Sequence, residues 1–304
     1  MRAVQLIALR QPLAERTITD PKLREGEVLI EIRAAGICHS DAHYRAGFSK
    51  LGTLPQTLGH EIAGVVVAGP NIGDRVAVHY LLGSGAMIGK DLDGGYAERI
   101  AVTAQNAVPI GPNVSFEVAA VMMCSTSTAF HALRLADVRP GEKVAVVGLG
   151  GVGVSAMLLA RMMGASVIGI DRIAEKRKLA ESAVADIRDV RGVDVVIDLV
   201  GHPDVRSEAI RALAPGGRLM LVALNDQPFT FDPYREVLAR ELRIIGSSDH
   251  LLSELHELMA FASEGKLDLS PLITRRIALD ATAVNTVLDD LERGTVDLRT
   301  VIVP

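Results

Sequence analysis

The sequence predicts an α/β protein of two domains, one rich in β-strands and one built on a doubly wound parallel sheet. The chain has 304 residues and is 49% hydrophobic, which suits about two domains of roughly 150 residues each. Short β-branched runs broken by glycine and proline fill the first part, whereas strands alternate with helical stretches after residue 141. We expect a β-rich domain of residues 1–125 and 250–304 and a parallel-sheet domain of residues 126–249.

The β-rich domain is predicted as a mostly antiparallel assembly. Apolar and β-branched residues run through segments 27–36, 60–70 and 74–80, each bounded by turn residues. After a helix over 251–265, the closing part of the chain adds a strand, a helix and a last strand. These cover residues 274–280, 281–294 and 299–304.

The second domain shows regular alternation of strands with helices. Strands are predicted over residues 143–150, 166–171, 194–200, 217–224 and 241–248, and helices over residues 151–164, 172–183 and 203–216. Such alternation is typical of parallel strands joined by right-handed crossovers.

Composition excludes several classes of partner. The 37 acidic and 32 basic residues give a formal charge of −5 without a cationic surface for nucleic acid. No apolar run approaches the ~20 residues of a membrane span, and the first residues lack the pattern of a secretory signal. We therefore expect a cytoplasmic protein that binds neither nucleic acid nor membrane. In that compartment two cysteines favour metal binding, catalysis or burial over a disulfide.

A glycine-rich turn opens the second domain. Gly148, Gly150 and Gly153 have G-x-G-x-x-G spacing directly after a strand and before a helix, with Gly151 and Val152 inside the motif. Glycines permit a tight turn and close approach of a pyrophosphate, and the helix N-terminus offers free N–H groups to phosphates. The motif predicts dinucleotide binding; the alternative is a glycine-rich turn without a ligand.

Asp171 ends the next predicted strand, 18 residues beyond Gly153. A carboxylate there can accept hydrogen bonds from the adenosine ribose and would repel a 2′-phosphate, which favours NAD over NADP. Arg172 favours the opposite choice because arginine is what a phosphate-binding variant would use. Arg172 and Lys176 are further candidate cofactor contacts.

Three residues in or beside the β-rich domain form a candidate metal set. Cys38, His60 and Cys124 would supply two thiolates and one imidazole, which suits zinc and leaves a fourth position for water or substrate. The long spacing fits a catalytic site better than a closed structural one. The alternatives are a hydrogen-bonded histidine and buried apolar cysteines.

Taken together, these motifs resemble those of zinc-dependent medium-chain alcohol dehydrogenases. GICHSDAH, LGHEIAGVV, the segment around Cys124, GLGGVG and the closing helix and strand occur in that family's order over essentially the whole chain. The resemblance implies a GroES-like catalytic domain and a Rossmann cofactor domain. It also implies that Cys38, His60 and Cys124 bind the catalytic zinc.

The resemblance assigns roles to other residues near the predicted metal site. Ser40 is similar to the hydroxyl residue that touches the alcohol, and His43 to the outer histidine that passes the proton to solvent through ribose hydroxyls. Asp41 is similar to the carboxylate that holds His60, although it could equally cap a helix. Glu61 resembles the acidic neighbour of the site.

Three cofactor contacts also follow from the resemblance. His39 is similar to a residue near the pyrophosphate, Thr128 to a threonine beside the nicotinamide, and Arg299 to an arginine that reaches the cofactor phosphates. Arg299 could instead be an ordinary solvated strand residue.

The implied activity is reversible hydride transfer between a primary or secondary alcohol and NAD, with an aldehyde or ketone as product. One alternative is a zinc-free quinone or enoyl reductase, which would need none of the three metal ligands. Another is a non-catalytic dinucleotide-binding protein, which would not need Ser40 and His43. We expect a homodimer or homotetramer paired through segment 242–248.

The sequence departs from the family pattern at three places. Residues 79–98 contain no cysteines for a second, structural zinc, so we expect one catalytic zinc per subunit, with the shortened loop held by glycines and its own packing. Segment 181–198 is short, so one crossover is expected to be a loop. Leu298 precedes Arg299 where the family commonly has glycine.

Overall fold

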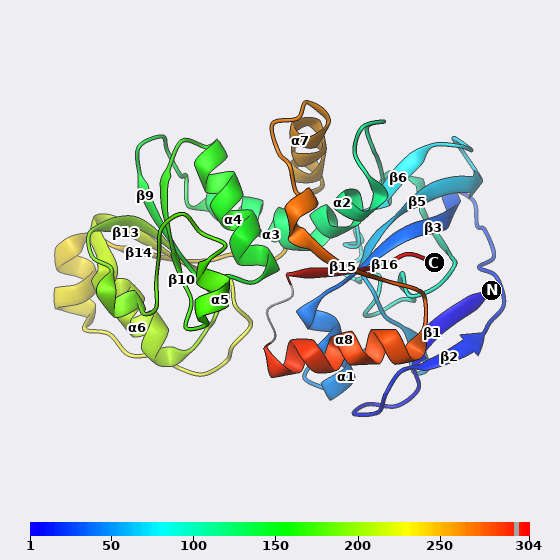
Figure 1. Cartoon of the computed structure of the whole chain (residues 1–304), viewed down its shortest axis with the longest axis horizontal. Coiled ribbons are helices and arrows are strands. Elements are labelled where there is room, and N and C mark those ends of the chain that lie inside the picture. Colours follow the sequence, from blue (N-terminus) through cyan, green and yellow to red (C-terminus); the bar gives the residue numbers. More distant parts are fainter. Residues whose placement is uncertain (295–297) are drawn as a thin grey trace. The chain divides into compact units, whose positions relative to one another are not determined.

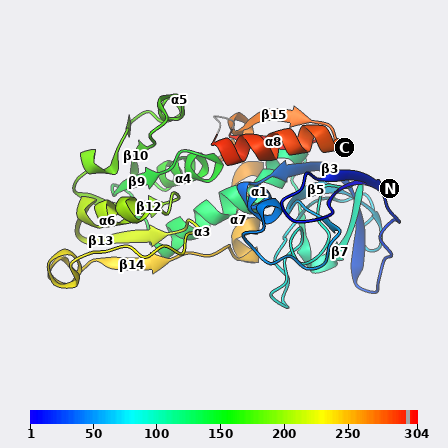
Figure 2. The same cartoon turned by 90° about the horizontal axis from the view of Figure 1, so that it is seen from below.

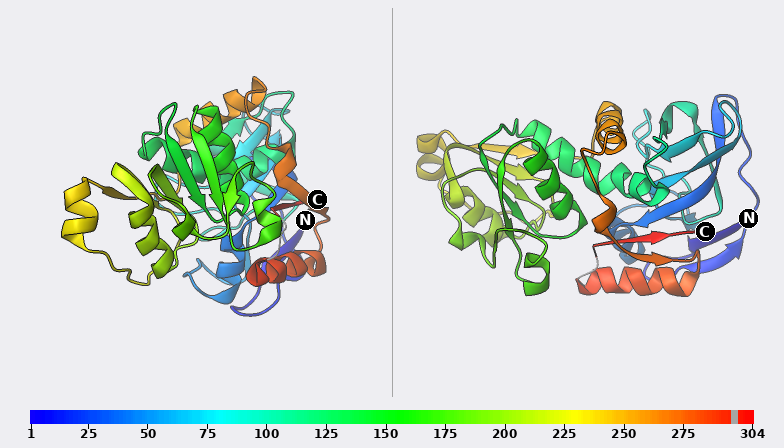
Figure 3. Two further views of the ribbon diagram at one scale, coloured as in Figure 1. Left: turned by 60° about the vertical axis from the view of Figure 1, so that its left-hand side comes forward. Right: turned by 45° about the horizontal axis from the view of Figure 1, so that its top comes forward.

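The computed structural model describes residues 1–294 and 298–304 as two compact units. Unit 1 comprises Met1–Cys124 and Leu255–Pro304, and unit 2 comprises Ser125–Glu254. Figure 3 shows both chain ends among the strands of unit 1. The mixed α/β architecture confirms the predicted fold class.

Unit 1 is built on two sheets (Figure 1). The larger contains β3 (Glu27–Ile37), β5 (Glu61–Ala68), β6 (Arg75–Val78), β7 (Arg99–Thr103), β8 (Ala107–Pro109), β15 (Ile273–Ile277) and β16 (Arg299–Ile302). Its order is β15-β16-β3-β5-β6-β8, with β7 also paired to β3. The smaller contains β2 (Ala14–Thr17), β1 (Arg2–Leu6) and β4 (Gln56–Thr57), in that order. All pairs are antiparallel except β15 with β16.

Alternating burial explains the central strand of unit 1. In β3 the side chains of Val28, Ile30 and Ile32 are buried while intervening residues are partly exposed, as expected for a strand with one face on the core. The helices of this part are α1 (His39–Ala46), α2 (Phe116–Val121), α7 (Leu252–Ser263) and α8 (Ala281–Arg293), with 3₁₀ turns at Ala104–Asn106 and Ser270–Leu272. Helix α7 begins in unit 2 and continues into unit 1.

Helix α8 shows why the closing segment folds against unit 1. Val284, Val287 and Leu288 are buried at helical spacing, which gives the helix one apolar face. Its first turn is capped by Asp280, whose side chain accepts a hydrogen bond from the Ala283 N–H. The helix ends at Arg293 and is followed by Gly294 in the left-handed conformation.

Unit 2 is a doubly wound parallel sheet. Its strands are β9 (Lys143–Val147), β10 (Ser166–Ile170), β11 (Ala183–Val184), β12 (Val193–Asp198), β13 (Leu213–Leu221) and β14 (Arg243–Gly246). The order is β11-β10-β9-β12-β13-β14, and Figure 2 shows β13 and β14 side by side. Because the chain builds outward from β9 in both directions, the carboxyl end of β9 is the switch point where such sheets bind ligands.

Unit 2 has one helix before its first strand and others between its strands. The helices are α3 (Ser127–Leu135), α4 (Gly151–Met162), α5 (Ala174–Arg177) and α6 (Pro203–Ala212), with short turns at Ile187–Asp189, Pro233–Val237 and Leu238–Arg240. Helix α4 contacts β9 and β10, whereas α6 contacts β12 and β13.

Two local expectations have different outcomes in unit 2. The helix expected over 172–183 is wrong: only α5 forms, and none of its residues is buried, so this charged segment lacks the apolar face that stabilises a helix by packing. The expected loss of a crossover helix is confirmed, because only the 3₁₀ turn Ile187–Asp189 lies between β11 and β12.

A helical stretch over residues 116–135 contains α2, a π-helical turn at Met122–Thr126, and α3. It is long and apolar enough to cross a membrane, but 78% of the qualifying window is buried inside the protein. This burial is the pattern of a core helix.

Candidate functional site

Four potential metal-binding side chains converge in unit 1. The ligand atoms of Cys38, His60, Glu61 and Cys124 all lie within 4.8 Å of one another, and all four residues are buried. Strands β3 and β5 are antiparallel with Gly36 opposite Glu61. The end of β3 and the start of β5 therefore meet at one edge of the sheet, which brings Cys38 and His60 together.

The two sulfur atoms have a spacing suited to a shared metal. The Sγ atoms of Cys38 and Cys124 are 4.0 Å apart, whereas a disulfide needs about 2.0 Å. Two thiolates bound at about 2.3 Å to a tetrahedral zinc lie about 3.8 Å apart. Cys124 comes from the π-helical turn at Met122–Thr126, a local irregularity that often occurs at functional sites.

The carboxylate of Asp41 lies beside the imidazole of His60. Its Oδ1 lies 3.4 Å from His60 Nδ1, which leaves Nε2 as the nitrogen available to a metal. Asp41 Oδ2 accepts a 2.9 Å hydrogen bond from the Cys38 N–H, so Asp41 both caps α1 and faces the imidazole. A carboxylate behind a metal-binding histidine is the usual arrangement in proteins.

The groups around Cys38 favour its thiolate form, which is the form that binds a metal. Its hydrogen bond with the Cys124 thiol, assisted by His60, holds the Cys38 pKa well below its ordinary value despite burial. Burial acts to lower the pKa of His60, but the charges and hydrogen bonds of Asp41 and Cys38 outweigh it and raise that pKa. The donor types present fit zinc, because the set contains two soft sulfurs, one imidazole and a nearby carboxylate.

Glu61 and Arg299 form a buried ion pair beside the metal ligands. The Arg299 guanidinium donates to Glu61 Oε2, and the Arg299 and Glu61 side chains are 5% and 0% exposed, respectively. The alternative that Arg299 is a solvated strand residue is wrong. Burial raises the pKa of Glu61 to about 7, although Arg299 opposes this shift. A cofactor-phosphate role for Arg299 stays a prediction.

The glycine turn of unit 2 has space for a side chain at Gly150 and none at Gly153. Gly148 has φ +96°, and a Cβ at Gly153 would lie 1.9 Å from the Gly148 carbonyl oxygen. At Gly150, by contrast, a Cβ would meet nothing within 4 Å. Gly151 and Val152 begin α4, whose first N–H groups have no acceptor within the helix. Pyrophosphate binding at this turn stays a prediction.

Asp171 lies against this glycine turn. Its two carboxylate oxygens accept hydrogen bonds from the backbone N–H groups of Leu149 and Ile173, both at 2.9 Å. Arg172 is exposed and Lys176 is partly buried. The sequence predictions did not include Arg177. Its guanidinium donates to the backbone carbonyls of Asp171 and Arg172, and its place six residues after Asp171 was the one feature of the sequence that pointed to this contact.

Comparison with known proteins identifies the family. Residues 24–112 match the alcohol dehydrogenase GroES-like domain, and residues 151–264 match the zinc-binding dehydrogenase domain. An NAD-dependent alcohol dehydrogenase of Saccharolobus solfataricus is 32% identical over 100% of both chains. The chain belongs to the zinc-type medium-chain alcohol dehydrogenase family.

Two further proteins are similar to this chain over nearly its whole length. Acryloyl-coenzyme A reductase of Metallosphaera sedula is 28% identical over 92% of this chain and 93% of its own. The structure of a cobalt- and zinc-bound thermostable alcohol dehydrogenase from Pyrobaculum aerophilum has a TM-score of 0.90, 26% identity and coverage of 100% and 99%.

The predicted proton-relay residues of this dehydrogenase lie on α1. Ser40 Oγ is 3.7 Å from Cys38 Sγ, and Ser40 and His43 have the i, i+3 spacing that places side chains on one helix face. The rings of His39 and His43 are 4.7 Å apart at their centroids. Burial and the neighbouring His39 lower the pKa of His43, which favours the neutral imidazole.

Thr128 and His39 are the remaining predicted cofactor contacts. Thr128 lies near the start of α3 and is partly exposed, whereas the residues on either side of it are buried. His39 is exposed at the first position of α1. Their cofactor roles stay predictions.

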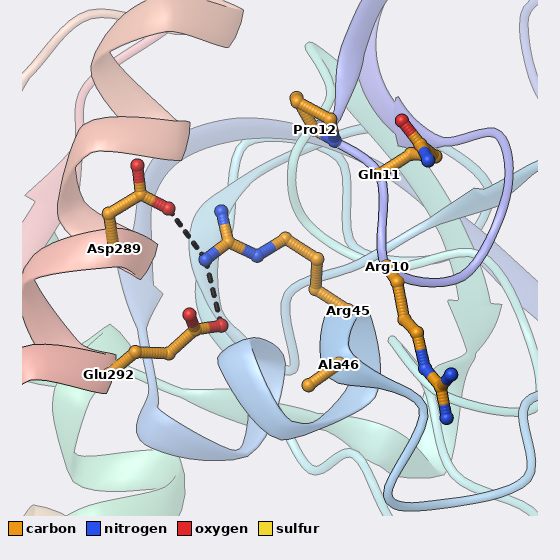
Figure 4. Close-up of a pocket in the computed structure, with 7 residues that line it drawn as sticks. All are labelled: Arg10, Gln11, Pro12, Arg45, Ala46, Asp289 and Glu292. Atoms are coloured by element: carbon orange, nitrogen blue, oxygen red, sulfur yellow. Dashed lines mark hydrogen bonds and ion pairs between the residues drawn. The ribbon is translucent and has the colours of Figure 1, made fainter.

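Unit 1 also contains a pocket of about 400 Å³ with a different lining. The pocket is lined by Arg10, Gln11, Pro12, Arg45, Ala46, Asp289 and Glu292. Figure 4 shows Asp289 and Glu292 of α8 both reaching Arg45 of α1, at 2.7 and 2.8 Å. These ion pairs join two helices, and we assign the pocket no part in the chemistry.

Proposed function

We propose that this family member is a zinc-dependent alcohol dehydrogenase that transfers hydride reversibly between NAD and a primary or secondary alcohol, with an aldehyde or ketone as the other partner. The convergence of Cys38, His60 and Cys124, with Asp41 behind the imidazole, is the observation that supports this function most strongly. A chain without metal chemistry would have no need to bury this donor set together.

Three side chains would hold one zinc ion per subunit, leaving a position for substrate. When bound, zinc supplies Lewis-acid chemistry that lowers the pKa of an alcohol and polarises a carbonyl. Glu61 stays beside the ligands, where its charge is balanced by Arg299. Burial of all these groups excludes water and strengthens their electrostatic effects.

Proton transfer is assigned to two residues of α1. The Ser40 hydroxyl, close to the Cys38 sulfur, would accept the proton that the alcohol loses. His43 would take the proton onward to solvent, because its lowered pKa makes the neutral, accepting form dominant near neutral pH. In carbonyl reduction the same residues would return a proton to the product oxygen.

Cofactor binding is assigned to unit 2. The N-terminus of α4 would bind the pyrophosphate at the open side of Gly150, and the Asp171 carboxylate would receive the ribose hydroxyls. The carboxylate supports a preference for NAD over NADP. Thr128, His39, Lys176 and Arg299 remain proposed contacts.

An enoyl-type reductase is the second candidate, supported by the similarity to acryloyl-coenzyme A reductase. A zinc-free reductase would not need Cys38, His60 and Cys124 to converge, and this favours the alcohol dehydrogenase. The purified protein should therefore contain zinc and reduce NAD with members of a panel of alcohols and polyols. Reduction of acryloyl-coenzyme A without metal, with no alcohol oxidised, would support the second candidate instead.

We further propose a homodimer or homotetramer in the cytoplasm. Strand β14 ends the sheet order of unit 2 and pairs with β13, so its other edge offers backbone groups to a second subunit. The two cysteines do not form a disulfide with each other, since their Sγ atoms lie 4.0 Å apart, which suits a reducing compartment. A monomer by light scattering at micromolar concentration would contradict the proposed assembly.

A further inference from the structure

The shortened loop of residues 79–98 ends alongside the segment that precedes His60. The N–H groups of Gly94, Gly95 and Tyr96 donate to the carbonyls of Thr57, Gly59 and Leu58 at 2.8, 2.7 and 3.0 Å. These three hydrogen bonds fix residues 94–96 against residues 57–59. The loop is therefore attached directly to the chain that leads into a predicted metal ligand.

Glycines allow an unusually close approach at this contact. Gly59 has φ +92°, and a Cβ there would lie 2.5 Å from Cδ1 of the Tyr96 ring. A Cβ at Gly94 would lie 2.1 Å from the Gly59 carbonyl oxygen. The ring of Tyr96 thus occupies space that a side chain at position 59 would fill, so position 59 must be glycine.

In this position the phenol of Tyr96 forms a hydrogen bond with Asp41. Its hydroxyl donates a 2.8 Å hydrogen bond to Asp41 Oδ2, while Asp41 Oδ1 faces His60 Nδ1 at 3.4 Å. Tyr96 and Asp41 are both fully buried. Burial and the charge of Asp41 raise the pKa of Tyr96 well above its ordinary value, so the phenol remains a donor.

We propose that Tyr96 is a positioning residue that acts through Asp41 to orient His60 for metal binding. The inference rests on the proposed zinc function and adds a role for the loop that lacks the structural-zinc cysteines. Without the phenol, the Cys38 N–H would be the one hydrogen-bond donor left to Asp41 Oδ2 within residues 1–294 and 298–304. A buried carboxylate that loses a hydrogen bond is less firmly held and less stable as a charge.

A purely structural role for Tyr96 predicts that removing only its hydroxyl leaves zinc affinity unchanged. The ring is part of the core of unit 1, and phenylalanine would preserve that packing. Tyr96→Phe therefore removes the hydroxyl with little change in volume. Residues behind a metal-binding histidine typically alter metal affinity by ~10- to 100-fold.

The test measures zinc affinity of the full chain by competition with a chromogenic chelator, and the visible spectrum after cobalt substitution. Tyr96→Phe is compared with Tyr234→Phe, the same chemical change at a residue that is 67% exposed in unit 2. We expect Tyr96→Phe to bind zinc ~10-fold more weakly and to shift the cobalt bands. Tyr234→Phe should leave both unchanged.

Asp41→Asn provides the second variant and the decisive comparison. If Tyr96 acts through Asp41, Tyr96→Phe should weaken zinc binding far less in the Asp41→Asn background than in the unaltered protein. An equal loss in both backgrounds, or zinc affinity of Tyr96→Phe within twofold of the unaltered protein, would overturn the inference. Failure of the unaltered protein to bind zinc would instead contradict the proposed function.

Discussion

Cys38 and Cys124 lie 86 positions apart in the chain, yet their sulfur atoms are 4.0 Å apart in the buried interior of unit 1. Cys38 follows the end of β3, and Cys124 lies in the π-helical turn at Met122–Thr126. The pairing is close enough for a shared metal and too long for a disulfide. Zinc binding should therefore depend on both thiols.

Cys124→Ala should remove zinc and turnover together. Two remaining protein ligands do not hold a catalytic zinc as three do, so activity should fall to background. NAD affinity should stay within a few fold, because the glycine turn belongs to unit 2. Elemental analysis and cofactor titration check both statements, and full activity in a metal-free Cys124→Ala protein would contradict the zinc mechanism.

Alanine at Gly150 and Gly153 should separate cofactor binding from folding. Gly150 has open space beside it, so alanine there should leave stability within ~0.5 kcal/mol but intrude where the pyrophosphate binds. Gly153→Ala places a Cβ against the Gly148 carbonyl and should destabilise unit 2 by ~1–3 kcal/mol. Thermal unfolding and NAD titration of the two variants provide the comparison; equal stability losses would argue against this interpretation of the turn.

Asp171→Ala should weaken NAD binding and shift the preference toward NADP. The change removes the carboxylate that we propose receives the ribose hydroxyls and repels a 2′-phosphate, and leaves Arg172 available to a phosphate. The carboxylate also accepts from the Leu149 N–H, so Asp171→Asn is the control that retains an acceptor. Ratios of kcat/KM for the two cofactors give the answer, and an unaltered enzyme that already prefers NADP would show the assignment of Asp171 to be wrong.

Ser40→Ala should reduce kcat more than His43→Ala, because the hydroxyl is proposed to touch the alcohol whereas water can partly replace the histidine. Acid and base groups of this kind contribute ~100- to 10,000-fold. The lowered pKa of His43 favours its neutral imidazole at lower pH than for an ordinary histidine, so the acid decline of alcohol oxidation should lie below the pKa of an ordinary histidine. The pH profile of kcat for both variants tests this order; small, equal losses would argue against the relay.

Much of the fold follows from short-range patterns in the sequence. Alternating burial in β3 and the regular succession of strands and helices after residue 143 are local signals, and both appear in the structure. The helix expected over 172–183 failed because its charged residues have no core to pack against. Helical propensity alone did not reveal that missing contact.

The candidate site was harder to predict than the fold, because its residues lie far apart in the sequence. Cys38, His60 and Cys124 carry weak signals singly; their donor types suggested a zinc set, and the family resemblance made that assignment specific. The contacts of Tyr96 with Asp41 and of Arg299 with Glu61 depend on tertiary packing. No spacing in the sequence specifies such contacts between distant segments.

Metal stoichiometry tests the proposed chemistry most directly. The chain has two cysteines, both in the catalytic set, and loop 79–98 is held by backbone hydrogen bonds and close glycine contacts. Elemental analysis of the purified protein should therefore give one zinc per subunit, and mild chelation should abolish activity while far-UV circular dichroism stays unchanged. Two tightly bound zinc ions per subunit, full activity without zinc, or unfolding in step with zinc removal would contradict it.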